Sequence, residues 1–380
     1  MRPRKLGILC YPTLGGSARV ATELARYWAH AGVEVQLLGY ERAPGLDPAV
    51  HFRHVHVAEY PLFRYPPYDL ALAAEIVELH ESKGVACFHA HYALPHALAL
   101  ELADRMLGGG RLYWVTTLHG TDITLLGGHP AYRRALGYGL RASGAVTAVS
   151  RSLAEETQAL LHLEREVRVV PNFVSVPELG RRVDPAWLSA SGEQERCIVH
   201  VSTLRAVKRV LDLIDAFALL RQRLPVRLRI VGEGPQRSLS EARARELGLA
   251  PFIDFLGELK EPEQLLRDAD LYCFSSRTES FGLGLLEAMA MGIPVLGPRV
   301  GGVPELLGPE LSDWLVEPAR PLALARAAES LLTDASAWRR ASELGRARAR
   351  EQFRIEAAIA GYEAAFAEAK VQSGFSGGRL

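Results

Sequence analysis

The sequence has few cysteines and no pair of them at the close Cys-x-x-Cys spacing. It contains four cysteines in 380 residues, and each lies in or beside an apolar run. Cysteines in such positions are typical of buried free thiols in a reducing compartment. Their scarcity excludes a small, disulfide-dense secreted domain and predicts a cytoplasmic protein.

The sequence also lacks a charge excess and a long apolar run. Its 44 Lys and Arg balance 44 Asp and Glu, so we expect neither nucleic acid nor an anionic membrane surface as a partner. The apolar run after the basic N-terminus ends at Cys10, too short for a signal peptide. No segment reaches the roughly 18 apolar residues of a spanning helix. These features predict a soluble protein with local anion sites, and they leave a homo-oligomer open.

The sequence does contain a repeated alternation of short apolar runs and amphipathic stretches. This alternation predicts an α/β fold with parallel sheets covered by helices on both faces. Its elements include helices over 95–107, 210–221, 283–291 and 355–370, and strands over 85–89 and 112–117. Prolines and glycines interrupt the pattern between 171 and 195, which we interpret as an interdomain linker.

The length of 380 residues favours two domains, with a single barrel as the alternative. We therefore predict two doubly wound Rossmann-like domains whose binding loops lie at the carboxyl ends of the strands. The residues after 372 have the composition of a disordered tail.

Glycine-rich turns follow strands in both halves. Gly15 and Gly16 follow the first predicted strand and lead into a helix, where free backbone amides attract an anion. A simple tight turn is the alternative. Neither this turn nor Gly232-Glu233-Gly234 fits a dinucleotide fingerprint, because the third glycine is missing and Arg237 takes its place in the second turn. A dehydrogenase is therefore disfavoured.

Polar side chains follow two further strands of the first half. His119 and Asp122 should project from a strand end, where they can meet sugar hydroxyls, or else hydrogen-bond each other and brace the loop. His89 and His91 lie two apart on a strand and so face the same side, as a metal pair would. No nearby Cys, Asp or Glu completes a metal site, so structural histidines are favoured.

Charged residues lie in two segments of the second half. Arg205, Lys208 and Arg209 follow a predicted strand, and fixed cations there can stabilise a diphosphate leaving group. A solvated basic helix start is the alternative, but the helix dipole disfavours it. Glu279 and Glu287 are eight positions apart.

On a helix, the two glutamates would be separated by about 12 Å. A glycosidase pair requires roughly 5 to 10 Å. They therefore favour two contacts to one elongated ligand, with the amides of Phe281, Gly282 and Leu283 at its phosphates. The alternative is that neither glutamate binds a ligand and that one is a surface residue and the other caps the helix.

The sequence resembles the retaining GT-B glycosyltransferases of family four over nearly the whole chain. The resemblance rests on four motifs that occur in the family's order: the Gly15-Gly16 loop, Arg205 with Lys208, the Gly232-Glu233-Gly234-Pro235 turn, and Glu279 with Glu287. A narrower resemblance rests on the segments at 10–17, 65–70, 89–96 and 116–124. It is to the malate-accepting branch of that family, which uses UDP-N-acetylglucosamine and L-malate in the first step of bacillithiol biosynthesis.

The resemblance implies a GT-B fold with two domains facing a cleft. The acceptor-side domain would comprise residues 1–172 with about 353–380, because the C-terminal helix crosses back to it. The nucleotide-sugar domain would comprise 173–352.

Three groups of site residues follow from the resemblance. The catalytic residues would be His119, Arg205, Lys208 and Glu279. The donor-binding residues would be Gly15, Gly16, Asp122, Phe281, Gly282, Leu283 and Glu287. The acceptor-binding residues would be Ser17, Tyr92, Thr117 and Arg205.

The resemblance further implies transfer with retention by front-side attack, so that no side-chain nucleophile is needed. We expect no cofactor and no metal, because no aspartate-x-aspartate element follows a strand and cations already serve the diphosphate. Another acceptor, such as a sugar, an inositol derivative or a lipid, is the main alternative. A nucleotide-sugar-binding regulator without catalysis is the second, and the intact charged residues disfavour it.

Overall fold

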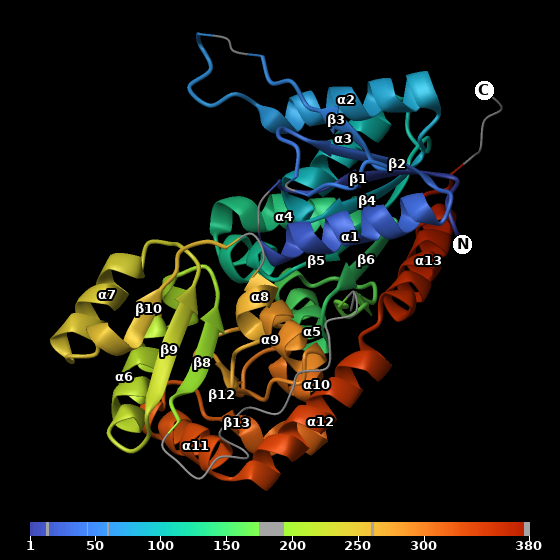
Figure 1. The fold of residues 1–380 in the computed structure, drawn as a ribbon. Coiled ribbons are helices and arrows are strands. Elements are labelled where there is room, and N and C mark those ends of the chain that lie inside the picture. Colours follow the sequence, from blue (N-terminus) through green and yellow to red (C-terminus); the bar gives the residue numbers. More distant parts are fainter. Residues whose placement is uncertain (13–14, 44, 59–60, 175–193, 260–261, 376–380) are drawn as a thin grey trace. The chain divides into compact units, whose positions relative to one another are not determined.

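The chain folds into two compact units, each built on one parallel sheet (Figure 1). The computed structural model describes residues 1–380 except 13–14, 44, 59–60, 175–193, 260–261 and 376–380. The first unit comprises Met1–Asn172 with Glu356–Leu380, and the second comprises Phe173–Ile355. The predicted linker lies mostly outside the described residues, as does the end of the predicted tail.

The first unit has a seven-stranded parallel sheet in the order β3-β2-β1-β4-β5-β6-β7. Its strands are β1 Lys5–Leu9, β2 Glu34–Gly39, β3 His51–His54, β4 Cys87–His91, β5 Tyr113–Leu118, β6 Ala145–Ala148 and β7 Arg168–Val169. Its helices are α1 Gly16–His30, α2 Tyr68–Lys83, α3 Leu98–Met106, α4 Pro130–Ala142, α5 Arg151–Leu161 and α13 Ile355–Gln372, with π-helical turns η1 Ala93–Ala97 and η2 Asp122–Gly127. The strand order reverses between β1 and β4, and ligands of such sheets bind beyond the strand ends at this switch point.

The second unit has a six-stranded parallel sheet in the order β10-β9-β8-β11-β12-β13. Its strands are β8 Arg196–Val201, β9 Val226–Val231, β10 Ile253–Phe255, β11 Leu271–Cys273, β12 Val295–Pro298 and β13 Leu315–Val316. Its helices are α6 Val210–Arg221, α7 Arg237–Glu246, α8 Pro262–Leu266, α9 Leu283–Ala290, α10 Val303–Leu307, α11 Pro321–Thr333 and α12 Ala335–Gln352, with 3₁₀ turns η4 Ala206–Lys208, η5 Ala250–Phe252 and η6 Pro309–Trp314. The switch point lies between β8 and β11.

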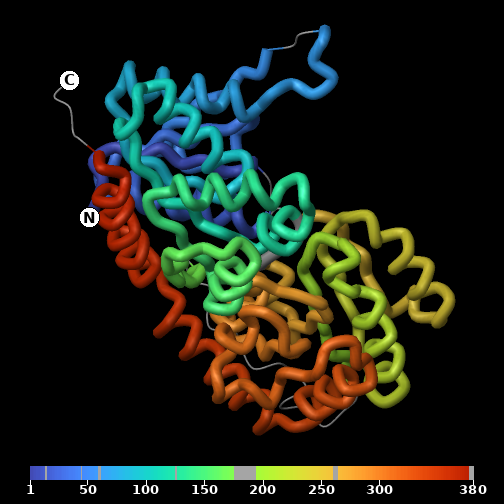
Figure 2. The backbone as a smooth tube through the Cα atoms, turned by 180° about the vertical axis from the view of Figure 1, so that it is seen from behind, coloured from blue at the N-terminus to red at the C-terminus, as the bar shows by residue number. Residues whose placement is uncertain are grey.

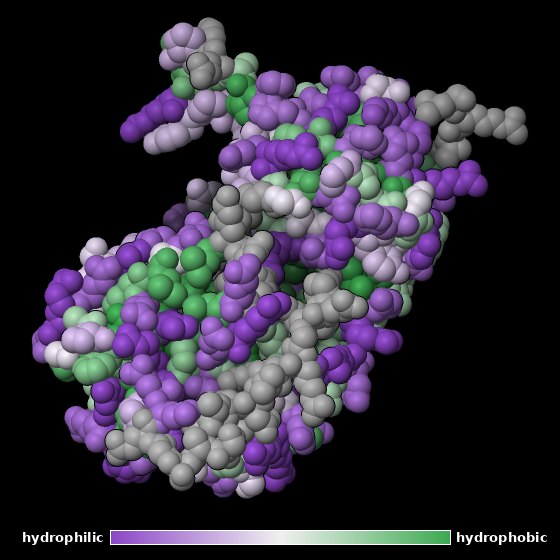
Figure 3. All heavy atoms as spheres, in the orientation of Figure 1, coloured by the Kyte–Doolittle hydropathy of each residue, from purple (hydrophilic) through white to green (hydrophobic). Residues whose placement is uncertain are grey.

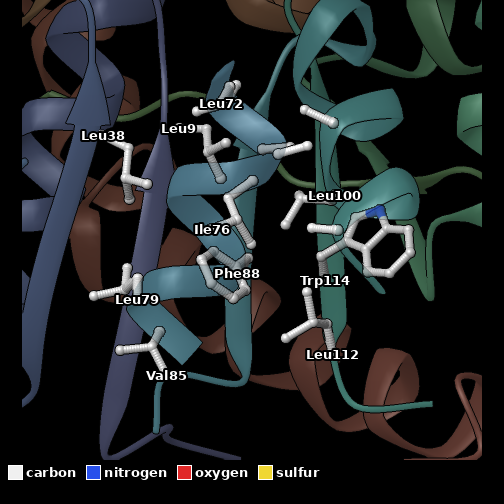
Figure 4. Close-up of a cluster of buried hydrophobic side chains, with 14 of the residues drawn as sticks. Leu9, Leu38, Leu72, Ile76, Leu79, Val85, Phe88, Leu100, Leu112 and Trp114 are labelled. Carbon is white, nitrogen blue, oxygen red and sulfur yellow. The ribbon is translucent and has the colours of Figure 1, made fainter. Parts of the chain in front are cut away.

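Helix packing on the first sheet buries a dense apolar cluster (Figure 4). Leu72 and Ile76 of α2 pack with Phe88 of β4, and none of the three is exposed. Because β4 and β5 are buried along their whole length, their sequence shows no polar alternation. The cluster makes the middle of the sheet a rigid support for the loops that follow β1, β4 and β5.

The C-terminal helix α13 belongs to the first unit, as the GT-B resemblance implied. The Phe366 ring lies 6.3 Å from that of Trp28, and the Tyr362 ring lies 4.8 Å from that of His89. Figures 1 and 2 both show α13 beside the elements of this unit. The first unit is therefore completed by a segment that follows the whole second unit in the sequence.

Several elements differ from their predicted extent. The helix predicted over 95–107 begins as the π-helical turn η1 and continues as α3, while the strand predicted over 85–89 is shifted to Cys87–His91. The helices α4 and α10 were not predicted. By contrast, α6 spans the predicted 210–221, and α9 ends one residue before its predicted end.

Polar side chains cover most of the molecular face drawn in Figure 3. Exposed apolar side chains include Leu62 and Tyr65 in the segment before α2. None of the described helices combines the length and apolar character needed to cross a bilayer. The four cysteines are free thiols, of which only Cys197 is partly exposed.

Candidate active site

The switch point of the first sheet brings together the loops after β1 and β4. Gly15 caps α1, and the hydroxyl of Ser17 in the first turn lies 3.0 Å from that of Tyr92, which follows β4. Tyr11 donates a hydrogen bond to the Leu94 carbonyl at 3.1 Å, and its ring lies 5.5 Å from that of Tyr92. Tyr92 has φ 78°, a strained value for a residue with a Cβ, and such strain is found at functional positions.

His119, at the end of β5, lies beside this cluster. Its Nε2 is 2.9 Å from Nδ1 of His91, and its ring centroid is 5.3 Å from that of Tyr92. Desolvation lowers the pKa of His119 to about 3, so the imidazole is neutral at physiological pH. The side chain is only half-buried, so the ring can still meet a ligand as a neutral hydrogen-bonding group.

Asp122 is fully buried, and its predicted contact with a sugar stays a prediction. Its Oδ1 accepts a hydrogen bond from the backbone amide of Gly120 at 3.0 Å. Burial raises the pKa of the Asp122 carboxyl to about 6. Asp122 therefore braces the loop that carries His119, through the backbone and not through a bond to that imidazole.

Thr117 is also buried, and its predicted contact with the acceptor stays a prediction. Its hydroxyl lies 2.7 Å from His89 Nε2 and 2.7 Å from the Thr147 hydroxyl. Both contacts hold the hydroxyl inside the sheet. Because β5 is buried on both faces, no polar alternation in the sequence indicates that this threonine points inward.

The switch point of the second sheet brings together the loops after β8 and β11. Lys208 in the first loop forms an ion pair with Glu279 in the second, with Nζ and Oε2 2.6 Å apart. Arg205 is half-buried, and its Nε has no hydrogen-bond partner among the described residues. The hydroxyl of Ser275, after β11, contacts the carbonyls of Lys208 and Arg209 at 2.9 and 2.8 Å and so fixes the basic loop.

Glu279 precedes α9 and does not lie on it, which corrects the estimate of one helical rise between Glu279 and Glu287. The helix begins at Leu283 after Gly282, whose φ of 98° is left-handed. The chain thus turns sharply between the two glutamates. The first amides of α9, around Gly282 and Leu283, are the positions where an anion is favoured.

Tyr272 of β11 underlies the start of α9. Its hydroxyl donates to the Val201 carbonyl at 3.0 Å. A Cβ built on Gly284 would lie 2.4 Å from the hydroxyl oxygen of Tyr272. The Glu287 and Glu279 carboxylates contribute to raising the pKa of the Tyr272 phenol, after the larger effect of burial. Both glutamates therefore lie near the buried phenol of Tyr272.

The Gly232-Glu233-Gly234 turn after β9 supports the basic loop. The Leu204 amide donates to the Glu233 carbonyl at 2.8 Å. A Cβ built on Gly234 would lie 2.6 Å from the Leu204 carbonyl oxygen, and φ there is 151°. Glycine is required for this backbone contact, which sets the position of Arg205 one residue later.

The structure thus collects the predicted residues into one cluster per unit. Ser17, Tyr92 and His119 lie together in the first, and Lys208 and Glu279 in the second. Sequence reasoning missed Tyr11 and Ser275, although both follow strands at a switch point. Among the described residues, no group of three or more His, Cys, Asp or Glu is placed to hold a metal ion.

Comparisons with known proteins agree along most of the chain. The family described as Glycosyltransferase Family 4 matches residues 14–177, and that described as Glycosyl transferases group 1 matches 187–348. The N-acetyl-alpha-D-glucosaminyl L-malate synthase of Bacillus anthracis is 38% identical over 94% of this chain and 95% of its own. The MMP alpha-(1->4)-mannosyltransferase of Mycolicibacterium hassiacum is 26% identical over 93% of this chain and 95% of its own.

Solved structures share the fold. Anabaena Alr3699/HepE in complex with UDP-glucose has a TM-score of 0.79 at 20% identity and covers 95% of this chain and 98% of its own. Two Rossmann-like units with clusters at both switch points define a glycosyltransferase of the GT-B class. With the full-length relationship above, the chain belongs to glycosyltransferase family four, as the sequence motifs predicted.

Proposed function

We propose that this protein is a retaining glycosyltransferase that moves N-acetylglucosamine from UDP-N-acetylglucosamine to the hydroxyl of L-malate. The observation that carries the proposal is the 38% identity to a malate synthase over 94% of the chain. The four segments of the narrower resemblance include Ser17, Tyr92 and His119, which form the cluster in the first unit. The product, N-acetylglucosaminyl-malate, would be the first intermediate of bacillithiol biosynthesis.

The cluster of the second unit binds the donor in this proposal. Arg205 and Lys208 bind the diphosphate, aided by the first amides of α9. Lys208 exchanges part of its contact with Glu279 for a phosphate oxygen, which frees the Glu279 carboxylate to accept hydrogen bonds from the transferred sugar. Glu287 accepts hydrogen bonds from the ribose.

The cluster of the first unit binds the acceptor and the sugar. Ser17 and Tyr92 supply hydroxyl groups for a carboxylate of malate, and the amides after Gly15 and Gly16 favour an anion. His119 contacts the sugar as a neutral group. Thr117 and Asp122 hold the loop from within.

The reaction needs no side-chain nucleophile. The malate hydroxyl oxygen attacks the anomeric carbon on the face that the diphosphate leaves, so a carbon–oxygen bond forms there while the bond to the β-phosphate oxygen breaks. The proton of the hydroxyl passes to that phosphate oxygen. Arg205 and Lys208 stabilise the negative charge that develops on the leaving group.

The test is release of UDP from UDP-N-acetylglucosamine with and without L-malate, with the product mass measured in the same tube. We expect UDP release that depends on malate and a product of the mass of the sugar-malate conjugate. UDP release that does not depend on malate would indicate that the protein uses another acceptor. Absence of donor turnover with any acceptor would overturn the proposal.

The ion pair of the second unit provides a direct prediction. We expect Lys208→Met to lower kcat/KM about 100-fold, because one fixed charge at a developing anion is typically worth that much. The matched control is Lys83→Met, an exposed lysine at the end of α2 that should leave kcat/KM unchanged. Equal activity of the two variants would remove Lys208 from the donor site.

Metal independence is a further part of the proposal. We expect full activity in excess chelator, because Arg205 and Lys208 supply the positive charge that a divalent ion would otherwise bring. A loss of activity that magnesium restores would show that these two side chains are insufficient.

A different acceptor is the second candidate. It is favoured by the mannosyltransferase relative, whose 26% identity also extends along the chain. A panel of sugar and inositol phosphates in the UDP-release assay separates the two: malate should give the highest kcat/KM by at least about 100-fold, the discrimination expected when buried polar groups lose their partners.

A further inference from the structure

The first unit contains a second polar layer behind the substrate-facing cluster, and the proposed reaction does not use it. His89 and His91 of β4 are both without exposed surface, and their ring centroids lie 4.2 Å apart. His89 is bonded to Thr117, as described above. His91 is bonded to His119, which is the only half-buried member of this group.

The contact between His91 and His119 has a defined geometry. The joined atoms are Nδ1 of His91 and Nε2 of His119, 2.9 Å apart. The two rings lie nearly parallel, with an interplanar angle of 22° and centroids 5.2 Å apart. Tyr92 lies near a different part of the His119 ring, with a centroid distance of 5.3 Å. The imidazole of His119 thus lies between His91 and Tyr92, and it shares a hydrogen bond with Nδ1 of His91.

The hydrogen bond between Nδ1 of His91 and Nε2 of His119 contains one hydrogen, which belongs to one of the two rings. Burial lowers the pKa of His119 to about 3 and that of His91 well below its usual value. Both rings are therefore neutral near pH 7, and each carries a single N–H. Either His91 donates from Nδ1 to Nε2 of His119, or His119 donates from Nε2 to Nδ1 of His91.

The buried environment of His91 decides between these two arrangements. Nε2 of His91 is buried and has no hydrogen-bond partner in the part of the chain that the structure describes. If His119 donated, the hydrogen of His91 would sit on this Nε2 as a buried, unpaired donor, which proteins avoid. If His91 donates, Nε2 carries only an unpaired lone pair, which is tolerated better. His91 is therefore the donor.

We propose that His91 is a positioning residue that holds His119 in the Nδ1–H tautomer, so that Nδ1 of His119 donates a hydrogen bond to an oxygen of the bound substrate. The identity of that oxygen, on the transferred sugar, rests on the proposed function; the tautomer does not. A free neutral histidine can adopt either tautomer, and Asp122 on the same loop does not select one in His119, because its Oδ1 accepts from the Gly120 amide. The partner comes from the neighbouring strand.

The backbone of β4 keeps His91 in register for this contact. β4 pairs with β5 in parallel, with His91 opposite Thr117, so the side chains at the ends of the two strands are adjacent. His96 in η1 hydrogen-bonds through Nδ1 to the His91 carbonyl, which fixes the strand end from the other side. A hydrogen bond between two neutral imidazoles needs such placement, because each ring has one donor and one acceptor nitrogen and both point outward in the plane of the ring.

The first experiment reads the tautomer without using activity. In the protein labelled with ¹⁵N at histidine, long-range ¹H–¹⁵N spectra distinguish a protonated Nδ1 from a protonated Nε2, and signals are assigned with single-histidine variants. We expect His119 to be protonated on Nδ1 at pH 7.5. Protonation on Nε2 would overturn the proposal, whatever the substrates of the enzyme are.

The second experiment compares two substitutions of His91. His91→Phe keeps the bulk of the ring and removes the donor, whereas His91→Asn retains an N–H group near the position of Nδ1. We expect His91→Phe to lower kcat about 10-fold with KM for the donor nearly unchanged, and His91→Asn to regain most of that loss. This split is expected because an interaction that strengthens in the transition state acts on kcat.

His80→Asn is the matched control, since His80 is a half-buried histidine bonded to the Val85 carbonyl, away from the site. It should leave kcat and KM unchanged. Equal losses in His91→Phe and His91→Asn, with both melting like the wild type, would contradict a donor role. If His91→Phe does not fold, the wild-type tautomer and the rescue by asparagine still decide the question.

Discussion

At the scale of single residues, Asp122 is a buried carboxyl that braces the loop carrying His119. Its Oδ1 accepts from Gly120, while Oδ2 is buried without a partner among the described residues. Burial raises its pKa to about 6 from an ordinary value of 3.8. A carboxyl with a raised pKa stabilises the folded state at low pH and loses that contribution as pH rises through about 6.

Asp122→Asn should therefore change the pH dependence of folding. Between pH 5 and pH 8 the wild type should lose about 1 kcal/mol of unfolding free energy through this carboxyl, and the variant should not. Urea unfolding of both proteins at the two pH values gives the difference directly. Identical pH dependence in the two proteins would mean that Asp122 has an ordinary pKa.

The sequence predicted which residues follow the strands, but not which of them are buried. Thr117 and His119 lie two positions apart at the end of β5 and so face the same side, where a half-exposed strand would place both in solvent. β5 is buried on both faces, so the alternation carries no such information. The inward bonds of Thr117 depend on Thr147 in the next strand, a partner that only the folded sheet supplies.

At the scale of elements, the turn after β9 and the loop after β8 act as one unit. The Gly234 backbone fits against Leu204 only without a side chain, and the Gln236 amide also donates to the Leu204 carbonyl at 2.8 Å. The turn therefore holds the backbone that precedes Arg205. Its glycines serve backbone packing, which explains why they do not fit a dinucleotide fingerprint.

Gly234→Ala should displace this loop and lower kcat/KM about 10-fold or more, mainly through a higher KM for the donor. The matched control is Gly248→Ala, also at a positive φ of 67°, where an added Cβ meets no atom within 4 Å. It should cost only the roughly 1 to 2 kcal/mol of a left-handed residue and leave kinetics unchanged. Thermal melting and steady-state kinetics on both variants separate strain from displacement; similar kinetics would contradict the support role.

Elements were predictable where apolar residues recur at a clear spacing between glycines or prolines. This holds for α6 and α9, whose bounds lie within one residue of the prediction. It fails for α4, which begins with a run of exposed residues including Arg133 and Arg134, so its sequence resembles a loop. The predicted start of α9 at 283 already places Glu279 before the helix, so a helical separation between Glu279 and Glu287 was not the right estimate.

At the scale of the whole molecule, buried neutral histidines make the first unit sensitive to acid. His89, His91, His96 and His119 all have pKa values lowered by burial, to between about 3 and 4 where a value is resolved. Such groups stabilise the folded state above the ordinary pKa of 6.5, and this contribution is lost as pH falls towards the lowered values. In the second unit, His200 alone among the described residues shows this shift.

We therefore expect the first unit to open before the second as pH falls from 7 to about 4.5. The raised pKa of Asp122 stabilises the first unit at low pH, but this is one group and the four histidines have the opposite effect. Hydrogen exchange followed by mass spectrometry, corrected for the intrinsic rate at each pH, resolves the two units in the intact protein. Earlier loss of protection in the peptides of the second unit would contradict the prediction.

The path of the chain ties the first unit to its own C-terminus. Phe366 of α13 has no exposed surface and packs against Trp28 and His89, with centroids 6.3 and 5.7 Å away. Because α13 follows the whole second unit in sequence, the first unit cannot reach its full stability until synthesis is nearly complete. A substitution near the end of the chain should thus weaken the part of the protein that is made first.

Phe366→Ala should lower the unfolding free energy of the first unit by about 3 to 5 kcal/mol, the usual loss for a buried phenylalanine. Val371→Ala, on the same helix but 78% exposed, is the matched control and should leave stability unchanged. Hydrogen exchange in mild denaturant should show faster opening of peptides in α1 and β4 in Phe366→Ala, with peptides in α6 and β9 unaffected. Equal acceleration in both units would mean that they unfold as one cooperative body, whereas acceleration confined to α13 would mean that the helix frays without supporting the sheet.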